Sequence, residues 1–314
     1  MNLISLKKYD TAQIEKIIDA SIKIKQEPKK YCNLFKNKKM YMLFEKTSTR
    51  TSVAFGMGFN EHGGKFIMQR WEDSNFAVGE VVDETRYVAR NVDILLARLK
   101  LNETIELIGN FSTIPVINGC CNKYHPTQVL ADCMTIKEIF GTYNVKLAYI
   151  GVWNNVFNSL VLSFARLGGK LIGVCPIINE AAISKDEIAV VVKNTENLEI
   201  FDDKNMSPAK LTEIVNNVDV VYTDTWVDME FFDDPNYTEL KDAQIKLMTP
   251  FSLTKELLRN SKAKVMHDMP IHPGFEIERN IVESHIDTIL HQAENRRHVA
   301  KGIFTHLLDI EVKD

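Results

Sequence analysis

Residues 40–59 read MYMLFEKTSTRTSVAFGMGF, and this stretch decides the fold. Its apolar start, 40–44, predicts a buried strand, and the apolar residues from Val53 onward predict a helix over 51–62. The turn between them, 47–51, places hydroxyl groups and a guanidinium at a helix N-terminus, where unpaired backbone N–H groups and the helix dipole favour an anion. The pattern predicts a phosphate-binding turn, with an ordinary N-cap cluster beside a solvent-exposed arginine as the alternative. No Walker motif is present, which favours a small phosphorylated molecule over a nucleoside triphosphate.

Strand-like and helix-like segments alternate along the rest of the chain, which predicts an α/β fold with parallel sheets flanked by helices. The predicted strands are residues 40–44, 65–69, 93–98, 114–118, 146–151, 170–175, 197–201, 218–223 and 263–267. The predicted helices are residues 10–26, 51–62, 83–90, 103–111, 126–140, 155–167, 184–194, 208–216, 252–260 and 290–308. So many strands favour two sheets over one. We therefore expect two domains, 1–141 and 142–314.

The composition is that of a soluble globular protein, because 45% of the 314 residues are hydrophobic and 25% are charged. The formal net charge of −4 argues against a nucleic-acid partner or an anionic membrane. Five cysteines without regular spacing argue against a disulfide framework. The N-terminus lacks the apolar core of a signal peptide, and no apolar run has the roughly 20 residues that span a bilayer. We expect a cytoplasmic protein.

Three candidate site residues lie at or after the ends of predicted strands in the first domain. In open parallel sheets, ligands bind beyond the carboxyl ends of the strands. Arg98 ends the strand 93–98, so its charge can point into a cleft. His125 lies near the N-cap of the helix that Pro126 begins, and Gln128 lies one turn further along the same face. A histidine and an amide that converge on one small group suit polarisation of a carbonyl. A solvent-exposed arginine and a capping histidine are the alternatives.

Polar residues also follow strands of the second domain. Asn154 and Asn155 can bind a polar head group, or they can form an Asx turn. Asp224, Asp228 and Glu230 lie within seven residues of each other, and such a group would attract an amine. A solvated acidic loop is the competing interpretation.

Two further segments, His267-Asp268-Met269-Pro270 and Glu294-Asn295-Arg296, would not stand out alone. The signals for a metal are weak, because Cys121 and His125 lack further ligands at useful spacing and no HExxH motif exists.

Taken together and in this order, the segments resemble the aspartate/ornithine carbamoyltransferase family over nearly the whole chain. The motifs are Ser48-Thr49-Arg50-Thr51, Arg98, His125-Pro126-Thr127-Gln128, Asn154-Asn155, Asp224-Thr225-Trp226, His267-Asp268-Met269-Pro270 and Glu294-Asn295-Arg296. The Asn-Asn turn, the Asp-x-Trp segment and the His-x-x-Pro ending are similar to the ornithine branch. This branch transfers the carbamoyl group of carbamoyl phosphate to ornithine, giving citrulline and phosphate.

The resemblance implies a role for each matching residue. The first domain would bind carbamoyl phosphate through Ser48, Thr49, Arg50, Thr51, Asn75, Arg98, His125, Gln128 and Arg296. The second domain would bind the amine through Asn155, Asp224, Asp228, Met229, Asp268 and Met269. The catalytic residues among these would be Arg50, Arg98, His125 and Asp224.

The resemblance also implies an architecture and a set of partners. The C-terminal helix, about 290–308, would pack back on the first domain, and the active sites would lie near subunit interfaces of a homotrimer. A loop at about 74–80 would reach into the neighbouring subunit's site. The partners would be carbamoyl phosphate and an amine, with no cofactor, metal, nucleic acid or membrane.

Several positions depart from the usual pattern of the ornithine branch. They are Ser52 in place of an arginine, Asn75 in place of glutamine, Asp228 in place of serine, Glu230 in place of glycine, and Asp268 and Met269 in place of cysteine and leucine. Asp228 and Asp268 add negative charge where an amino acid would have to fit, and like charges in a cleft repel. An acceptor more cationic than ornithine, such as putrescine, is therefore an alternative.

Two further alternatives come from different functional classes. The chain could be a non-catalytic relative that binds carbamoyl phosphate, or a dinucleotide-dependent dehydrogenase, which shares the architecture. The glycine pattern argues against the dehydrogenase, because Glu61 stands where the third glycine of G-x-G-x-x-G belongs.

Overall fold

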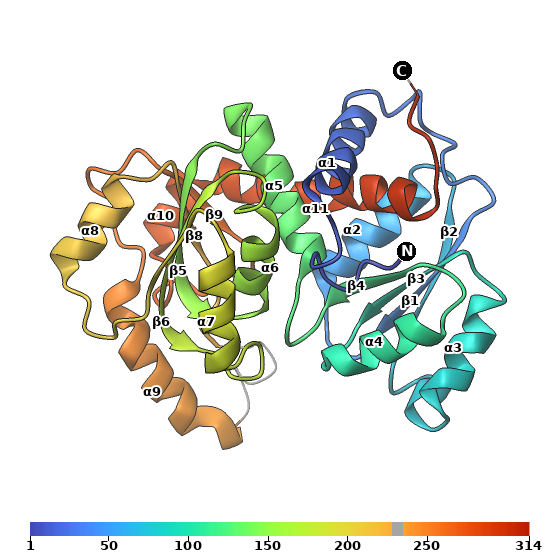
Figure 1. The fold of residues 1–314 in the computed structure, drawn as a ribbon, viewed down its shortest axis with the longest axis horizontal. Coiled ribbons are helices and arrows are strands. Elements are labelled where there is room, and N and C mark those ends of the chain that lie inside the picture. Colours follow the sequence, from blue (N-terminus) through green and yellow to red (C-terminus); the bar gives the residue numbers. More distant parts are fainter. Residues whose placement is uncertain (228–234, 314) are drawn as a thin grey trace. The chain divides into compact units, whose positions relative to one another are not determined.

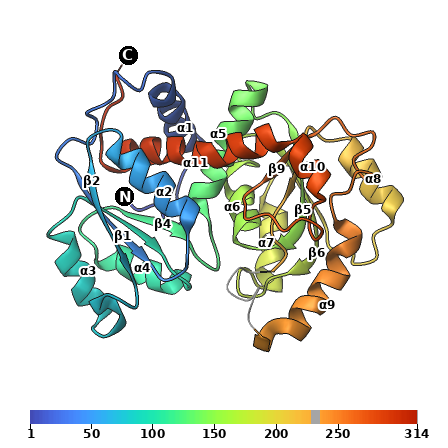
Figure 2. The same ribbon diagram turned by 180° about the vertical axis from the view of Figure 1, so that it is seen from behind.

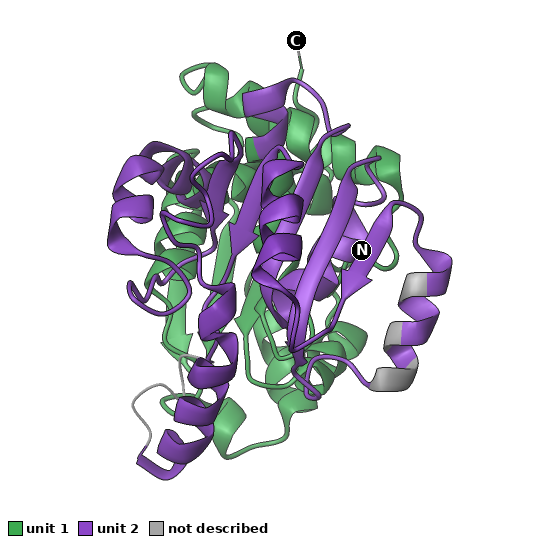
Figure 3. Cartoon of the chain, turned by 90° about the vertical axis from the view of Figure 1, so that its left-hand side faces the viewer, with its two compact units in different colours: residues 1–135, 294–314 green, residues 136–293 purple. Residues whose placement is uncertain are grey.

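The computed structural model describes residues 1–227 and 235–313. The chain divides into two compact units, which Figure 3 shows in green and purple. Unit 1 comprises Met1–Thr135 and Glu294–Asp314, and unit 2 comprises Ile136–Ala293. Among the described residues, no helix is both long and apolar enough to cross a membrane.

Unit 1 is built on a four-stranded parallel sheet with the strand order β2-β1-β3-β4. Its elements are α1 (Thr11–Gln26), β1 (Lys39–Phe44), α2 (Thr49–Asn60), β2 (Lys65–Arg70), η1 (Asn75–Ala77), α3 (Val81–Ala89), β3 (Ile94–Arg98), α4 (Asn102–Phe111), β4 (Val116–Cys120), most of α5 (Pro126–Phe140) and the later part of α11 (Ile286–Leu307). Helices α3 and α4 cover one face of the sheet, and α1, α2 and α11 lie on the other (Figures 1 and 2).

Unit 2 is built on a five-stranded parallel sheet with the order β7-β6-β5-β8-β9. Its further elements are β5 (Lys146–Trp153), α6 (Asn155–Ser163), β6 (Lys170–Ile178), α7 (Lys185–Asn194), β7 (Leu198–Phe201), α8 (Pro208–Asn216), β8 (Val220–Thr223), η2 (Pro235–Tyr237), α9 (Thr238–Met248), η3 (Thr249–Phe251), β9 (Lys264–His267) and α10 (Arg279–Ser284). Helices α6 and α7 lie on one face, and α8 and α10 lie on the other (Figures 1 and 2).

The C-terminal helix packs back on the first unit, as predicted. Phe304 of α11 makes edge-to-face contacts with Phe55 and Phe59 of α2. Gly302 has no room for a side chain, because a Cβ there would lie 2.2 Å from the carbonyl oxygen of Ile17 in α1. The close approach of α11 to α1 therefore requires a glycine at this position.

The register of the parallel strands brings the polar segments of each unit to one edge of its sheet. In unit 1, Phe44 pairs with Arg98, so the turn after β1 lies beside the end of β3. In unit 2, Thr223 pairs with both Ile150 and His267, so the segments after β5, β8 and β9 lie side by side. Both sheets thus bring their polar segments to the edge beyond the carboxyl ends of the strands, where open parallel sheets bind ligands.

The structure confirms all nine predicted strands, with ends that differ by up to three residues, but not every predicted helix. The helix predicted over 252–260 is wrong. The N–H of Leu253 donates to the carbonyl of Glu276 (2.9 Å), and its carbonyl accepts from the N–H of Glu278 (3.0 Å). This pairing with a distant segment takes the backbone groups that would begin a helix.

Among the described residues of unit 2, the α-helices α9 and α10 were not predicted. Only Met248 is buried in α9, so the helix lacks the apolar stripe that reveals an amphipathic helix in a sequence. Helix α10 has six residues, too few for a periodic pattern to appear.

Candidate functional site

The first part of the candidate site is the N-terminus of α2. Ser48 is the N-cap, and its hydroxyl accepts a hydrogen bond from the N–H of Thr51 at 3.2 Å. The N–H groups of Thr49 and Arg50 belong to the first turn of the helix, where backbone donors point toward a ligand that approaches the N-terminus. Arg50 is half-buried in this turn. The turn therefore combines backbone donors, the positive end of a helix dipole and a guanidinium.

The buried hydroxyl of Thr51 joins this turn to two other segments. Its Oγ1 lies 3.0 Å from Nη2 of Arg296 in α11 and 3.4 Å from Nη1 of Arg98 at the end of β3. Both guanidinium groups donate to the one oxygen. Arg98 and Arg296, which lie 198 positions apart in the sequence, thus converge on the turn that carries Arg50.

His125 lies directly before α5 and is 4% exposed. Burial lowers the pKa of its imidazole well below the ordinary value, and the charges of Arg296, Arg98 and Arg50 lower it further. The imidazole is therefore neutral at physiological pH. It offers one N–H donor among three cations without adding a fourth charge.

Gln128 is fully buried in the first turn of α5. Its Nε2 donates to Oδ1 of Asp132 at 2.9 Å, which fixes the orientation of the amide. Its Oε1 is buried and has no hydrogen-bond partner among the described residues. A buried acceptor without a partner costs free energy, so this oxygen suits a ligand that carries an N–H group.

Asn75 is a predicted site residue of unit 1 that lies outside the cluster around Thr51. It is exposed at the start of η1, and among the described residues its side chain forms no hydrogen bond. The sequence motif assigns it to a neighbouring subunit's site, so a position outside this cluster agrees with that expectation without testing it.

The second cluster lies in unit 2 around Asp224, which is 3% exposed after β8. Its Oδ2 accepts from Nδ2 of Asn154 at 2.7 Å, and its Oδ1 accepts from the N–H of Thr225 at 2.6 Å. The family resemblance assigns the binding of the acceptor molecule to Asn155, which begins α6. Asn154, the N-cap of that helix, is the one that touches Asp224, and its capping position is the signal that could have distinguished it.

Asp268 and Met269 lie beside this edge, after β9. Met269 has a left-handed backbone with φ of 64°, which costs free energy in a residue with a side chain. Its N–H donates to Nδ1 of His267 at 2.9 Å, so His267 carries its proton on Nε2 and donates to Oε1 of Glu276 at 3.1 Å. Oδ1 of Asp268, a mostly buried side chain, is 3.6 Å from Nδ1 of the same histidine.

Sequence reasoning missed the buried carboxylate of Glu276. Besides the bond from His267, it accepts the N–H of His272 at 2.5 Å, and Nδ1 of His272 lies 3.1 Å from the hydroxyl of Thr225. This network ties the segment after β9 to the segment after β8. No motif in the sequence marks Glu276. The predicted residues Asp228, Met229 and Glu230 lie outside the described residues.

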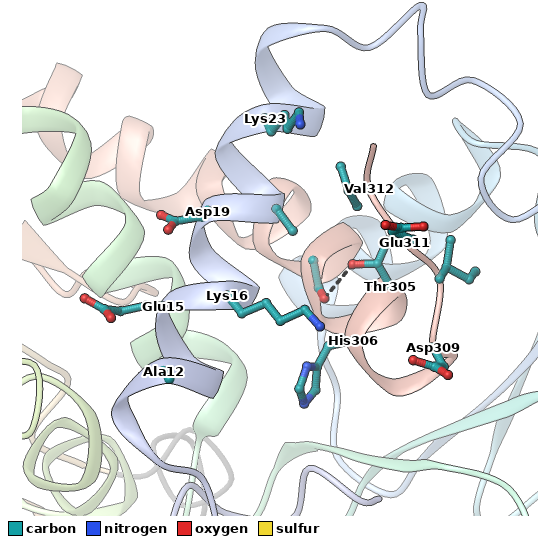
Figure 4. A pocket seen from close by; sticks show the side chains of 13 residues that line it. Ala12, Glu15, Lys16, Asp19, Lys23, Thr305, His306, Asp309, Glu311 and Val312 are labelled. Carbon is teal, nitrogen blue, oxygen red and sulfur yellow. Dashed lines mark hydrogen bonds between the residues drawn. The ribbon is translucent and has the colours of Figure 1, made fainter. Parts of the chain in front are cut away.

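A pocket of about 960 Å³ lies elsewhere in unit 1, between α1 and the C-terminal segment (Figure 4). Its labelled charged residues carry both signs: Glu15, Lys16, Asp19, Lys23, Asp309 and Glu311. None of the predicted site residues line it. Within the described ranges, no group of three His, Cys, Asp or Glu side chains is placed to hold a metal ion.

Comparisons with known proteins point to one family. Residues 1–138 match the family model "Aspartate/ornithine carbamoyltransferase, carbamoyl-P binding domain", and residues 143–307 match "Aspartate/ornithine carbamoyltransferase, Asp/Orn binding domain". The chain is 34% identical to an ornithine carbamoyltransferase of Methanococcus vannielii, covering 98% of this chain and 99% of the relative. It is also 34% identical to one of Archaeoglobus fulgidus, covering 99% and 98%.

Solved structures agree with these relatives. The ornithine carbamoyltransferase of Pyrococcus furiosus superposes with a TM-score of 0.85 at 28% identity, covering 98% of this chain and 97% of that one. The anabolic ornithine carbamoyltransferase of Campylobacter jejuni superposes with a TM-score of 0.84 at 30% identity, covering 98% of both chains.

Proposed function

Because the chain belongs to the aspartate/ornithine carbamoyltransferase family, we propose that it transfers the carbamoyl group of carbamoyl phosphate to the side-chain amine of ornithine, giving citrulline and phosphate. The observation that carries the proposal is the convergence of Arg50, Arg98 and Arg296 around the hydroxyl of Thr51 and the neutral imidazole of His125. Three cations beside a helix N-terminus form a site for a small, highly charged anion. Curated relatives and solved structures with the same architecture are ornithine carbamoyltransferases.

In this proposal, unit 1 binds carbamoyl phosphate. The first turn of α2, with Ser48, Thr49, Arg50 and Thr51, holds the phosphate, and Arg98 and Arg296 add charge. His125 donates to the carbamoyl oxygen. The buried Oε1 of Gln128 accepts from the carbamoyl NH₂, which supplies the partner that this atom lacks in the described structure.

The chemistry needs stabilisation of charge more than it needs a strong acid or base. When the amine attacks the carbamoyl carbon, negative charge develops on the carbonyl oxygen and then leaves with the phosphate. Fixed cations and hydrogen-bond donors that already surround this oxygen stabilise the transition state. A neutral His125 can donate to the oxygen and keep its proton, since the three arginines disfavour a further positive charge.

In the same proposal, unit 2 binds the amine. Asp224 pairs with an ammonium group of the acceptor, and Asn155 binds its carboxylate. Asp268 and the backbone of Met269 complete the site, with Asp228 and Met229 from outside the described residues. The side-chain amine has a pKa of about 10.4 in water. It must lose a proton before attack, and Asp224 or the departing phosphate can accept that proton.

The direct test measures the formation of a ureido product from carbamoyl phosphate with ornithine, putrescine, lysine or aspartate as separate acceptors. We expect ornithine to be carbamoylated with the highest kcat/KM. Turnover with putrescine alone would replace ornithine by a diamine, which the mostly buried carboxylate of Asp268 favours as the second candidate. Binding of carbamoyl phosphate without turnover of any acceptor would contradict an enzymatic function and indicate a non-catalytic relative.

The proposal extends to a homotrimer with active sites near the subunit interfaces. Strand β2 lies at the edge of its sheet, and its side chains Phe66, Ile67 and Met68 are 42–57% exposed. Val53 and Met57 of the neighbouring helix α2 are exposed as well. Exposed apolar side chains on an edge strand and on the helix that follows β1 support a subunit interface.

The assembly can be measured by analytical ultracentrifugation. We expect a mass near three times the 35.9 kDa of one chain. The variant Ile67→Lys is expected to sediment as a monomer, because it places a charge among the exposed apolar side chains of the edge strand β2. Leu240→Lys in α9 is the matched control, since it changes an equally exposed apolar residue in unit 2. A wild-type protein with the mass of one chain would contradict the trimer.

The assignment of one substrate to each domain and a cytoplasmic location are also part of the proposal. The carbamoyl phosphate residues lie in unit 1 and the described amine residues lie in unit 2. This supports functional domains close to 1–141 and 142–314, with the C-terminal helix, about 290–308, returning to the first domain. None of the five cysteines, all within the described residues, forms a disulfide. That absence is compatible with the reducing cytoplasm.

A further inference from the structure

The amide of Asn154 has a defined orientation. Its Oδ1 accepts the backbone N–H groups of Val156 (2.9 Å) and Phe157 (3.2 Å), which begin α6. The opposite orientation would place the NH₂ group against these two donors. The NH₂ group must therefore point away from the helix, and it donates to Oδ2 of Asp224 at 2.7 Å.

The hydroxyl of Tyr149 lies within hydrogen-bonding distance of the same amide oxygen. This hydroxyl is fully buried, 3.3 Å from Oδ1 of Asn154 and 3.0 Å from the carbonyl oxygen of Val152. Burial raises the pKa of the phenol well above its ordinary value, and the charge of Asp224 raises it further. Tyr149 therefore stays protonated, and its hydroxyl can donate to Oδ1 of Asn154 or to the carbonyl oxygen of Val152.

The carboxylate of Asp224 is consequently held on both sides. The amide of Asn154 donates to one oxygen, and the N–H of Thr225 donates to the other at 2.6 Å. Each donor is fixed to the backbone or to a helix N-terminus, so neither can follow a rotation of the carboxylate. These bonds set the plane of the carboxylate and leave its remaining lone pairs in a fixed direction.

We propose that Asn154 is a positioning residue, which orients the carboxylate of Asp224 toward the ammonium group of the acceptor. The inference rests on the proposed function, because it needs Asp224 to bind the amine. It gives Asn154 a role distinct from that of Asn155. Capping of α6 alone does not require this residue, since Asp and Ser are N-caps of similar quality. Of these caps, an ionised Asp has no proton to donate to Asp224.

The variant Asn154→Asp separates the two roles of the side chain. It keeps the cap, so the melting temperature is expected to change by only a few degrees. It also replaces the donor by a second carboxylate against Asp224, which displaces the carboxylate. We expect the KM for ornithine to rise by about 10- to 100-fold, on the order of one or two charge-assisted hydrogen bonds. The dissociation constant of carbamoyl phosphate should not change.

The pH dependence distinguishes positioning from a structural role. Two carboxylates this close share a proton as the pH falls, and the shared proton supplies a donor again. The ratio of variant to wild-type kcat/KM for ornithine is therefore expected to rise as the pH is lowered. Protonation of ornithine itself cancels in this ratio. If charge alone governed amine binding, the second carboxylate would lower the KM at high pH, and that result would overturn the inference.

Two further variants complete the experiment. Ser207→Asp changes the N-cap of α8 in the same way, away from Asp224, and is expected to leave all kinetic constants unchanged. Asn154→Ser keeps a cap without adding charge, so it tests the inference if Asn154→Asp does not fold. A wild-type KM for ornithine in a folded Asn154 variant would overturn the inference. An inactive wild-type protein would instead contradict the proposed function.

Discussion

Replacement of Arg50 by glutamine is expected to lower kcat by about 10²–10³-fold, which is the usual effect of removing one preorganised donor that stabilises developing charge. Arg50 lies half-buried in the first turn of α2, beside the residues that cap the helix. Glutamine is a good helix former, so the loss should reflect chemistry and not folding. Steady-state kinetics with saturating ornithine would measure it.

Two matched variants sharpen this first prediction. Arg50→Lys keeps the charge but loses the planar fork of donors, so its kcat should fall between those of the wild type and Arg50→Gln. Arg90→Gln makes the same change of net charge at an exposed position and should leave kcat unchanged. Equal kcat values for Arg50→Gln and the wild type would contradict the proposed role.

The same variant has a second expected effect, on the titration of His125. The charge of Arg50 is one of three that lower the pKa of this imidazole, so its removal should raise the pKa. Burial is the largest cause and is unchanged, so the pKa should remain below the ordinary value. NMR titration of the ring protons would follow this shift without reference to activity.

Much of the unit 1 cluster could be predicted from the sequence, because its residues lie at positions that local rules identify. Arg98 ends a continuous apolar strand, and Ser48 precedes a helix as its N-cap. Parallel strands then place both at one edge of the sheet. The contact of Arg296 with Thr51 could not be inferred from local rules, because it depends on the packing of α11 against α2 and only the family motif suggested it.

The unit 2 cluster was harder to predict, because its partners are chosen by tertiary geometry. Asn154 and Asn155 are chemically identical neighbours, and only the start of α6 between them decides which one faces Asp224. Glu276 contacts His267 and His272 through an irregular segment without a periodic pattern. The same segment pairs with Leu253, which is why the helix predicted over 252–260 does not form.

Replacement of Asp224 by asparagine is expected to lower kcat/KM for ornithine by at least about 10- to 150-fold, the equivalent of a charge-assisted hydrogen bond worth about 1.5–3 kcal/mol. The carboxylate is 3% exposed, so solvent screens its interaction with an ammonium group only weakly. If Asp224 also accepts the proton that the amine loses, kcat will fall in addition to the rise in the KM for ornithine.

The contacts of Asp224 predict a second cost for this variant. Both carboxylate oxygens accept hydrogen bonds, from Asn154 and from the N–H of Thr225. The amide of an asparagine must turn its own NH₂ group toward one of these donors. Two buried donors then face each other without an acceptor, which costs about 1–3 kcal/mol. The melting temperature should therefore fall, in contrast to Asp242→Asn, which removes an exposed acid of α9.

The prediction is tested by measuring which of the two substrates Asp224→Asn binds more weakly. The dissociation constant of carbamoyl phosphate, measured by calorimetry, should be the same for the wild type and Asp224→Asn, because the residues proposed to bind it lie in unit 1. The loss should be confined to the acceptor and should be larger for ornithine than for an acceptor without an α-amino group. An unchanged kcat/KM for every acceptor, with a lowered melting temperature, would mean that Asp224 supports the fold and does not bind the amine.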